Sequence, residues 1–165
     1  MPLPLSIRPA RAEDASACAA IYRPHVTQSW VSFELEAPDD TEMATRIAHY
    51  GASHAWLVAE REGAVIGYAY ASPHRTRAAY ASSCDVAIYV RPGAARSGAG
   101  RALYGALFAV LKEKGLHAAF AGVALPNPAS EALHRACGFT LVGVYREVGW
   151  KLGGWRDVAK WQRLL

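Results

Sequence analysis

A glycine-containing turn between residues 90 and 101 carries the most specific chemical signal in the chain. It has the sequence Val-Arg-Pro-Gly-Ala-Ala-Arg-Ser-Gly-Ala-Gly-Arg and joins a strand-like segment to a helix-like segment. The glycines at positions 98 and 100 leave backbone N–H groups accessible at a helix N-terminus, where the helix dipole favours an anion such as a pyrophosphate. A Gly-x-Gly turn alone is a weak motif, so a tight connection without a ligand is the alternative interpretation.

Two common nucleotide-binding motifs do not fit this turn. The dinucleotide fingerprint needs a third glycine three residues after the second, and this chain has Leu103 there. A Walker loop needs Gly-Lys-Ser/Thr, a sequence that the chain does not contain. The turn therefore indicates an anion site of another class.

The turn and a second motif downstream together resemble the GNAT superfamily of acyl-CoA N-acyltransferases. The pyrophosphate loop of that superfamily is Gln/Arg-x-x-Gly-x-Gly/Ala, and residues 95–100 match it except at Ala95. The superfamily also has an asparagine followed at fixed offsets by a small residue, an acid-donating tyrosine and Gly-Phe. At those offsets this chain has Asn127, Ser130, His134 and Gly138-Phe139, so a histidine replaces the tyrosine.

Several longer blocks resemble one branch of this superfamily, the phosphinothricin (methionine sulfoximine) N-acetyltransferases. The resemblance runs from about Ile7 to Gln162, and its most specific block is the tail from Val148 to Val158. It implies a homodimer that uses acetyl-CoA, needs no metal, and acetylates the α-amino group of a glutamate-like amino acid. The acceptors of this branch carry a tetrahedral phosphinyl or sulfoximine group.

The resemblance also implies how acetyl-CoA is held. The segment Ile88-Tyr89-Val90 is expected to bond the pantetheine arm as an added strand would, and a backbone N–H around Tyr89 or Val90 is expected to polarise the thioester carbonyl. Asn127 is expected to bond the same arm, with a helix N-cap as its alternative role. The expected cofactor-binding residues are Ile88, Tyr89, Val90, Arg96, Ser97, Gly98, Ala99, Gly100, Arg101 and Asn127.

Two residues are candidates for proton transfer. An α-amino group is mostly protonated near neutral pH, so a base must accept its proton directly or through water. The family places a glutamate just before the central strand, and this chain has Asp85 there, one methylene shorter. His134 is the second candidate, as a base or as an acid for the leaving CoA thiolate. A strand-entry aspartate and an ordinary helical histidine are the alternatives.

The candidate acceptor-binding residues are Arg75, Arg77, Tyr80 and Phe33. Two guanidinium groups and a phenol are suited to a carboxylate and a phosphinate or sulfoximine oxygen. An ordinary solvated loop is the alternative for the first three. Phe33 matches an aromatic residue of the family's acceptor pocket, and plain core packing is its alternative.

The periodicity predicts an α/β domain in which a mixed sheet is flanked by helices. The resemblance implies that this is the GNAT fold, with a mostly antiparallel sheet. The expected order is β-α-α-β-β-β-α-β-α-β-β. The first helix is predicted from Asp14 to Arg23, with Pro24 beyond its end. The other predicted segments are strand 7–9, helix 40–50, a hairpin of 55–60 and 65–70, strand 86–90, helix 100–114, strand 118–123, a helix ending at 137–138, and β-segments 139–145 and 158–164.

Composition excludes several protein classes. The chain has 165 residues, of which 52% are hydrophobic, and a formal net charge of +4. This suits one domain over residues 1–165, without internal repeats. The basic residues are dispersed, so no nucleic-acid partner is expected. No apolar stretch is long enough for a membrane span, and the first residues do not resemble a signal peptide. Three cysteines without paired spacing favour a cytoplasmic protein.

These observations predict an acetyl-CoA-dependent N-acetyltransferase that acts on a small glutamate-like amino acid by direct transfer in a ternary complex. Other functions fit the same motifs. The acceptor could instead be another small amine or a protein N-terminus, or the chain could be a CoA-binding regulator that has lost catalysis. Activity with an amine panel separates these possibilities.

Overall fold

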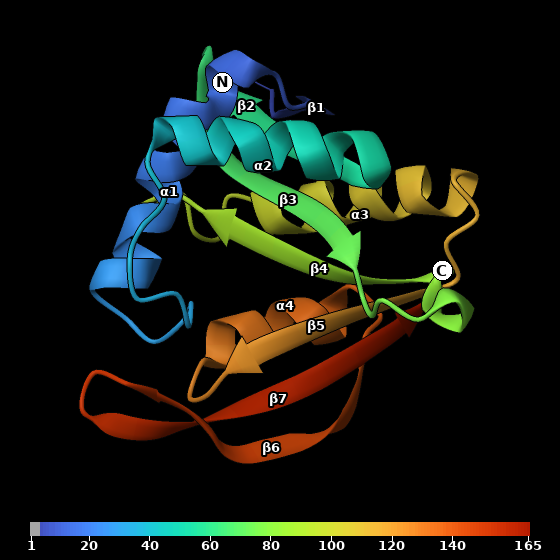
Figure 1. The fold of residues 1–165 in the computed structure, drawn as a ribbon. Coiled ribbons are helices and arrows are strands. Elements are labelled where there is room, and N and C mark those ends of the chain that lie inside the picture. Colours follow the sequence, from blue (N-terminus) through green and yellow to red (C-terminus); the bar gives the residue numbers. More distant parts are fainter. Residues whose placement is uncertain (1–3) are drawn as a thin grey trace.

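The computed structural model describes residues 4–165 as four helices and seven strands (Figure 1). Two short 3-10 turns, Ala12–Asp14 and Ala78–Tyr80, precede α1 and β4. The helices are α1 (Ala15–Thr27), α2 (Asp40–Ser53), α3 (Ala99–Glu113) and α4 (Pro128–Ala136). The strands are β1 (Ser6–Pro9), β2 (Ala55–Arg61), β3 (Ala64–Pro73), β4 (Ser83–Val90), β5 (Ala118–Ala124), β6 (Thr140–Lys151) and β7 (Gly154–Leu164).

The strands form one sheet in the order β1-β2-β3-β4-β5-β7-β6. All neighbouring strands are antiparallel except β4 and β5, which are parallel. This parallel pairing covers only Ser83–Asp85 opposite Ala118–Phe120. The predicted fold class, a mixed and mostly antiparallel sheet flanked by helices, is therefore confirmed.

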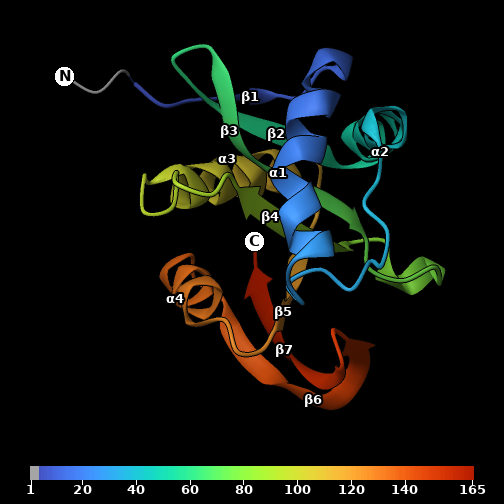
Figure 2. The same ribbon diagram turned by 90° about the vertical axis from the view of Figure 1, so that its left-hand side faces the viewer.

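The helices cover the two faces of the sheet. Figure 2 shows α1 and α2 on one face and α3 and α4 on the other. Strand β2 reflects this arrangement, because Trp56 and Val58 belong to the core under α1 and α2, whereas Leu57 belongs to the core under α3. Successive side chains of a strand point to opposite faces, so a strand that is covered on both sides is apolar throughout.

The first helix is longer than the sequence predicts. Pro24 lies inside α1, which continues to Thr27, so the prediction that the helix ends before this proline is wrong. Proline removes one backbone donor and usually ends or kinks a helix. Here the next turn buries Val26, which is 1% exposed, and the Gln28 N–H donates to the Pro24 carbonyl. Burial of this turn against the sheet offsets the cost of the proline.

The last two strands are also longer than predicted and form one hairpin. The sequence predicts separate segments over 139–145 and 158–164, but β6 and β7 pair from Thr140 to the turn at Leu152-Gly153. Both turn residues have positive φ, 51° and 74°, which is typical of the type I′ turns of β-hairpins. Two register shifts interrupt the pairing, and they obscure the period-2 pattern by which a strand is recognised in a sequence.

The three cysteines, Cys18, Cys84 and Cys137, are buried free thiols. Burial raises the pKa of the Cys18 and Cys84 thiols to about 12. Within residues 4–165 no helix has the length and apolarity that crossing a membrane requires.

Candidate active site

A cleft opens where β4 and β5 separate. Beyond Asp85 and Phe120 the two strands no longer pair, although both continue for several residues. We call this opening the β4–β5 cleft. It is lined by Val86–Tyr89 of β4, Ala121–Ala124 of β5, Asn127, Ser130 and His134 around α4, Tyr104 of α3 and Val31 of the α1–α2 loop.

The backbone of β4 presents hydrogen-bonding groups to this cleft. The Arg91 N–H donates to Ile66 O, so odd-numbered residues of β4 bond to β3 in the antiparallel ladder. Alternation then directs the N–H groups of Ile88 and Val90 toward the open edge, and that of Tyr89 toward β3. Of the two positions predicted to supply a donor to a thioester carbonyl, Val90 is therefore the one whose N–H faces the open edge of β4.

The loop between β4 and α3 has the geometry of an anion site. Gly98 is the N-cap of α3 with φ of 83°, and it makes no side-chain cap bond. Within residues 4–165 the backbone N–H groups of Arg96 and Gly98 have no acceptor, and those of Gly100 and Arg101 lie in the unbonded first turn of α3. Arg96 and Arg101 are exposed beside them. An anionic group can therefore be bound by backbone donors and two cations.

The predicted residues around α4 lie at the wall of the cleft. Asn127 is the N-cap of α4, and its Oδ1 accepts from the Ser130 N–H at 3.2 Å. His134 is 3% exposed, and burial lowers the pKa of its imidazole. Its Nδ1 donates to Ser130 O at 2.7 Å, which leaves Nε2 to accept from the Tyr104 hydroxyl at 2.9 Å. Both ring nitrogens are occupied, so a direct role in proton transfer requires one of these bonds to open.

Asp85 stands at the fork of the two strands and has a partner that the sequence analysis missed. Its Oδ1 lies 2.6 Å from His74 Nδ1, and its side chain is 45% exposed. His74 follows the end of β3, where Ser72 is paired with Asp85. The His74 ring stacks on Phe120 at 4.3 Å and meets Tyr80 edge-on at 5.9 Å. Only the β3–β4 register identifies this histidine, because Asp85 lies 11 residues away in the sequence.

The predicted acceptor loop lies next to this pair. Arg75 and Arg77 are exposed, and neither guanidinium has a hydrogen-bond or ion-pair partner in the described part of the chain. Tyr80 ends the 3-10 turn Ala78–Tyr80 and is 42% exposed. Two uncompensated cations thus lie in the segment that follows His74, and the phenol of Tyr80 meets the imidazole ring. No group of three potential metal ligands occurs within residues 4–165.

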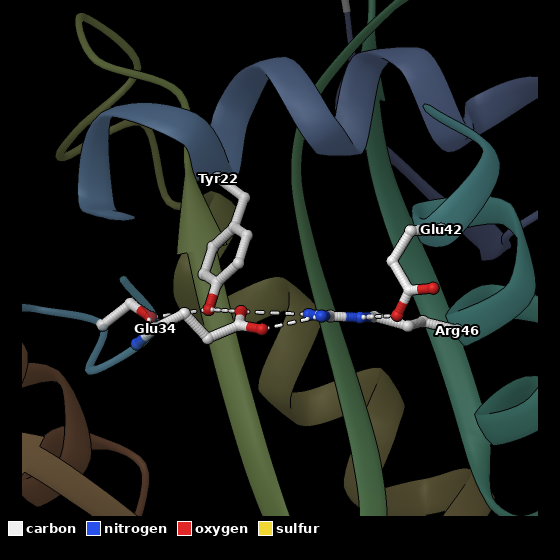
Figure 3. A network of polar contacts seen from close by, with 5 residues as sticks. Tyr22, Glu34, Glu42 and Arg46 are labelled. Atoms are coloured by element: carbon white, nitrogen blue, oxygen red, sulfur yellow. Dashed lines mark hydrogen bonds and ion pairs between the residues drawn. The ribbon is translucent and has the colours of Figure 1, made fainter. Parts of the chain in front are cut away.

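The α1–α2 loop, residues 28–39, is anchored to the helices by a polar network (Figure 3). Arg46 of α2 donates to both carboxylate oxygens of Glu34 at 3.0 and 2.6 Å, and to Glu42 at 3.0 Å. Tyr22 of α1 also donates to Glu34 and lies 2.6 Å from the Ser32 hydroxyl. The hydrogen bonds from Arg46 lower the pKa of Glu34. Its carboxylate therefore stays charged, and the bidentate pair fixes the loop to α2.

The other side of the same loop rests on the β6–β7 hairpin. Lys151, which is 5% exposed, donates from Nζ to Ser32 O at 2.5 Å. The Phe33 ring lies on Gly149, and a Cβ at that position would overlap the ring carbons. Arg156 of β7 lies over the Trp30 ring at 4.5 Å. Since Val31 lines the β4–β5 cleft, these contacts position one wall of the site.

Comparison with known proteins adds a consistent set of relatives. The acetyltransferase (GNAT) family matches residues 24–139. A phosphinothricin N-acetyltransferase of Alcaligenes faecalis is 41% identical over 162 residues, which cover 97% of this chain and 82% of the relative.

Two solved structures resemble the chain over nearly its whole length. One is a GNAT superfamily phosphinothricin acetyltransferase from Sinorhizobium meliloti in complex with AcCoA, with a TM-score of 0.93, 38% identity, and coverage of 98% of this chain and 88% of that one. The other is a ribosomal-protein-alanine N-acetyltransferase from Brucella melitensis, with a TM-score of 0.93, 34% identity, and coverage of 97% and 99%. Similar folds thus serve acceptors of very different size.

The contact between Phe33 and Gly149 makes a prediction about the α1–α2 loop. Gly149→Ala displaces the Phe33 ring from its position on β6, because the new Cβ would lie only 2.8 Å from Phe33 Cδ2. We expect amide exchange in residues 28–39 to become about tenfold faster, which corresponds to about 1.4 kcal/mol of local opening free energy. Gly143→Ala is the matched control on the same strand, since no atom lies within 4 Å of its Cβ position. Equal exchange in both variants would show that Gly149 does not position the loop.

Proposed function

The chain belongs to the GNAT acetyltransferase family, and we propose that it acetylates the α-amino group of a small amino acid bearing a second, tetrahedral polar group, as in phosphinothricin and methionine sulfoximine. It is an N-acetyltransferase with acetyl-CoA as its cosubstrate. One observation carries the proposed acceptor class. Asp85 lies at the fork of β4 and β5, with the β4–β5 cleft on one side and the loop of Arg75, Arg77 and Tyr80 on the other.

The residues present fit acetyl-CoA. The free N–H groups of Arg96 and Gly98, the first turn of α3 and the cations Arg96 and Arg101 suit a pyrophosphate. The open edge of β4 at Ile88 and Val90 offers the peptide groups that an amide-containing arm would bond. When bound, acetyl-CoA supplies an activated acetyl group at a thioester. The Val90 N–H is the donor that we propose for the carbonyl oxygen of that thioester.

The remaining roles are proposals about proton transfer and acceptor binding. The Asp85 carboxylate promotes removal of a proton from the acceptor ammonium group. His134 is retained as the acid for the departing CoA sulfur, a role that first requires one of its two hydrogen bonds to open. Arg77 and Arg75 bind the carboxylate and the tetrahedral group, and Tyr80 and Phe33 complete the pocket. The domain that holds all these groups spans residues 1–165.

Matched glycine variants test the cofactor loop. Gly93 and Gly98 have φ of 86° and 83°, and nothing lies within 4 Å of either Cβ position. An alanine at either site costs about 1–2 kcal/mol of backbone strain. We expect Gly98→Ala to weaken acetyl-CoA binding at least about tenfold in calorimetry, because its Cβ occupies space that the phosphates need. Gly93→Ala should retain the wild-type affinity. Equal affinities in the two variants would contradict phosphate binding at Gly98.

The acceptor proposal is tested by steady-state kinetics. Arg77→Ala should raise KM for methionine sulfoximine at least about tenfold, the effect of losing one charge-assisted contact, and should leave KM for acetyl-CoA nearly unchanged. Arg75→Ala should have a similar or smaller effect. Plain amines without a carboxylate and a peptide with N-terminal alanine complete the panel. If wild type acetylates either of these as efficiently as methionine sulfoximine, the arginines do not select the acceptor.

We also propose that two copies associate through the β6–β7 hairpin. Strand β6 is an edge strand and is exposed from Thr140 to Val148. On β6, the turn and the start of β7, the large apolar side chains that are 40–62% exposed are Leu141, Val142, Val144, Tyr145, Val148, Trp150, Leu152 and Trp155. An unpaired edge with this much apolar surface is typical of a protein interface. The resemblance to a homodimeric family supports a second copy as the occupant.

Charge substitutions on β6 test this association. We expect Val144→Asp and Val148→Asp each to convert a dimer into a monomer in sedimentation velocity, because an unpaired carboxylate would be buried at the interface. Thr41→Asp is the control, since it adds the same charge at an exposed threonine of α2, which is not part of the hairpin. A monomeric wild type, or a dimer that survives both valine substitutions, would refute the proposal.

A cytoplasmic location is proposed as well. The three cysteines are free and buried, which suits a compartment that keeps thiols reduced.

A further inference from the structure

His74 stands between the groups assigned to proton removal and acceptor binding, yet none of the roles above uses it. Its Nδ1 is 2.6 Å from Asp85 Oδ1, and its side chain is 16% exposed. The Phe120 ring stacks on one side at 4.3 Å, and Tyr80 approaches at 5.9 Å. The imidazole is therefore held in one orientation by a carboxylate and two aromatic rings.

The hydrogen bond to Asp85 determines which ring nitrogen can act as a base. A carboxylate only accepts, so Nδ1 of the imidazole must be the donor. In the neutral ring Nε2 then carries a free lone pair. Within residues 4–165 no group hydrogen-bonds to Nε2. This atom is also not enclosed by the protein, so a substrate can reach it. His134 differs, because both of its nitrogens are bonded.

The position of His74 relative to the sheet favours contact with an acceptor. Asp85, Ala87 and Tyr89 alternate onto one face of β4, and Tyr89 meets Tyr22 of α1 at 4.8 Å, so this is the face of α1, α2 and their loop. The Phe120 side chain shares that face, since Phe120 is paired with Asp85. His74 thus lies at the end of the β4–β5 cleft, beside the arginine loop.

We propose that His74 is the general base of the reaction and that Asp85 is its positioning residue, an inference that rests on the proposed function. Nε2 takes one proton from the acceptor ammonium group, and the Asp85 carboxylate stabilises the resulting imidazolium. The freed nitrogen lone pair forms the C–N bond to the acetyl carbon, and the C–S bond breaks with its electron pair on the CoA sulfur. The second nitrogen proton passes through His134 to that thiolate, and His74 returns its proton to solvent.

The side chain at position 85 supports this division of roles. The family resemblance implies a glutamate there, whereas aspartate is one methylene shorter. An imidazole bonded to the aspartate extends the reach of the pair toward the acceptor. The arrangement resembles the Asp–His part of a catalytic triad without the nucleophile. In that part a carboxylate orients a histidine, and the histidine moves the proton.

Kinetics with designed variants separate a base from a structural partner. His74→Gln can still donate an N–H to Asp85 but has no basic nitrogen. We expect its kcat, at saturating acetyl-CoA and methionine sulfoximine, to fall about 100-fold while KM for acetyl-CoA stays within about twofold. His74→Ala should lose activity similarly and regain part of it with added imidazole. His54→Gln, at a histidine beyond the end of α2, is the matched control and should behave as wild type.

Two results would overturn the inference. His74→Gln with a kcat close to wild type would show that the imidazole only holds Asp85. His74→Ala with a kcat close to wild type would show that no basic nitrogen is needed at this site. Failure of the proposed function looks different, because wild type itself would then transfer no acetyl group to an amino acid.

A measurement without turnover tests the same inference. Nitrogen-15 NMR of the histidine rings in the protein without substrates should show neutral His74 as the Nδ1–H tautomer with an unprotonated Nε2. Asp85→Asn should reduce the population of that tautomer, because its amide no longer provides a carboxylate acceptor. An Nε2–H tautomer in wild type would refute the role of His74, whatever the acceptor of the enzyme is.

Discussion

The early end of pairing between β4 and β5 is the constraint on which the site depends. Only three residue pairs join these strands, and beyond them the peptide groups of Ile88 and Val90 face an opening instead of another strand. Backbone N–H and C=O groups that leave water must find partners. An extended ligand with its own amide groups satisfies them as a further strand would. The open edge of the sheet therefore suits a ligand with the shape and hydrogen-bonding pattern of a peptide.

The same separation determines which side chains lie at the opening. Asp85 is the last residue of β4 that pairs with β5, so its carboxylate lies where the opening begins, and the β3–β4 register places His74 against it. The α1–α2 loop borders the opening through Val31 and is fixed by the Arg46–Glu34 pair on one side and by Lys151 on the other. This side of the cleft is thus assembled from segments far apart in the chain. The loop joins them by contacts with both the helices and the last hairpin.

The sequence predicts the periodic and motif-bearing parts of this structure well. The order of the elements, the β2–β3 hairpin with positive φ at Glu62 and Gly63, and the glycine turn before α3 all follow from local patterns. The end of α1 does not, because burial of Val26 by the sheet outweighs the local effect of Pro24. The contact of Asp85 with His74 and the packing of Phe33 on Gly149 also could not be predicted from the sequence. They depend on strand register and on contacts between distant segments. Sequence patterns identify residues that are neighbours on one helix or strand. A site also depends on residues that are far apart in the chain and close together in space.

The state of the cysteines has a practical consequence. A thiol reacts with disulfide and maleimide reagents as its thiolate, and a buried thiol with a raised pKa forms almost none at neutral pH. All three thiols are buried, and the pKa values of Cys18 and Cys84 are raised to about 12. The CoA released in each turnover is then the reactive thiol in solution. A chromogenic disulfide therefore follows product formation continuously with little background from the folded enzyme, and a single cysteine introduced at the surface can be labelled selectively.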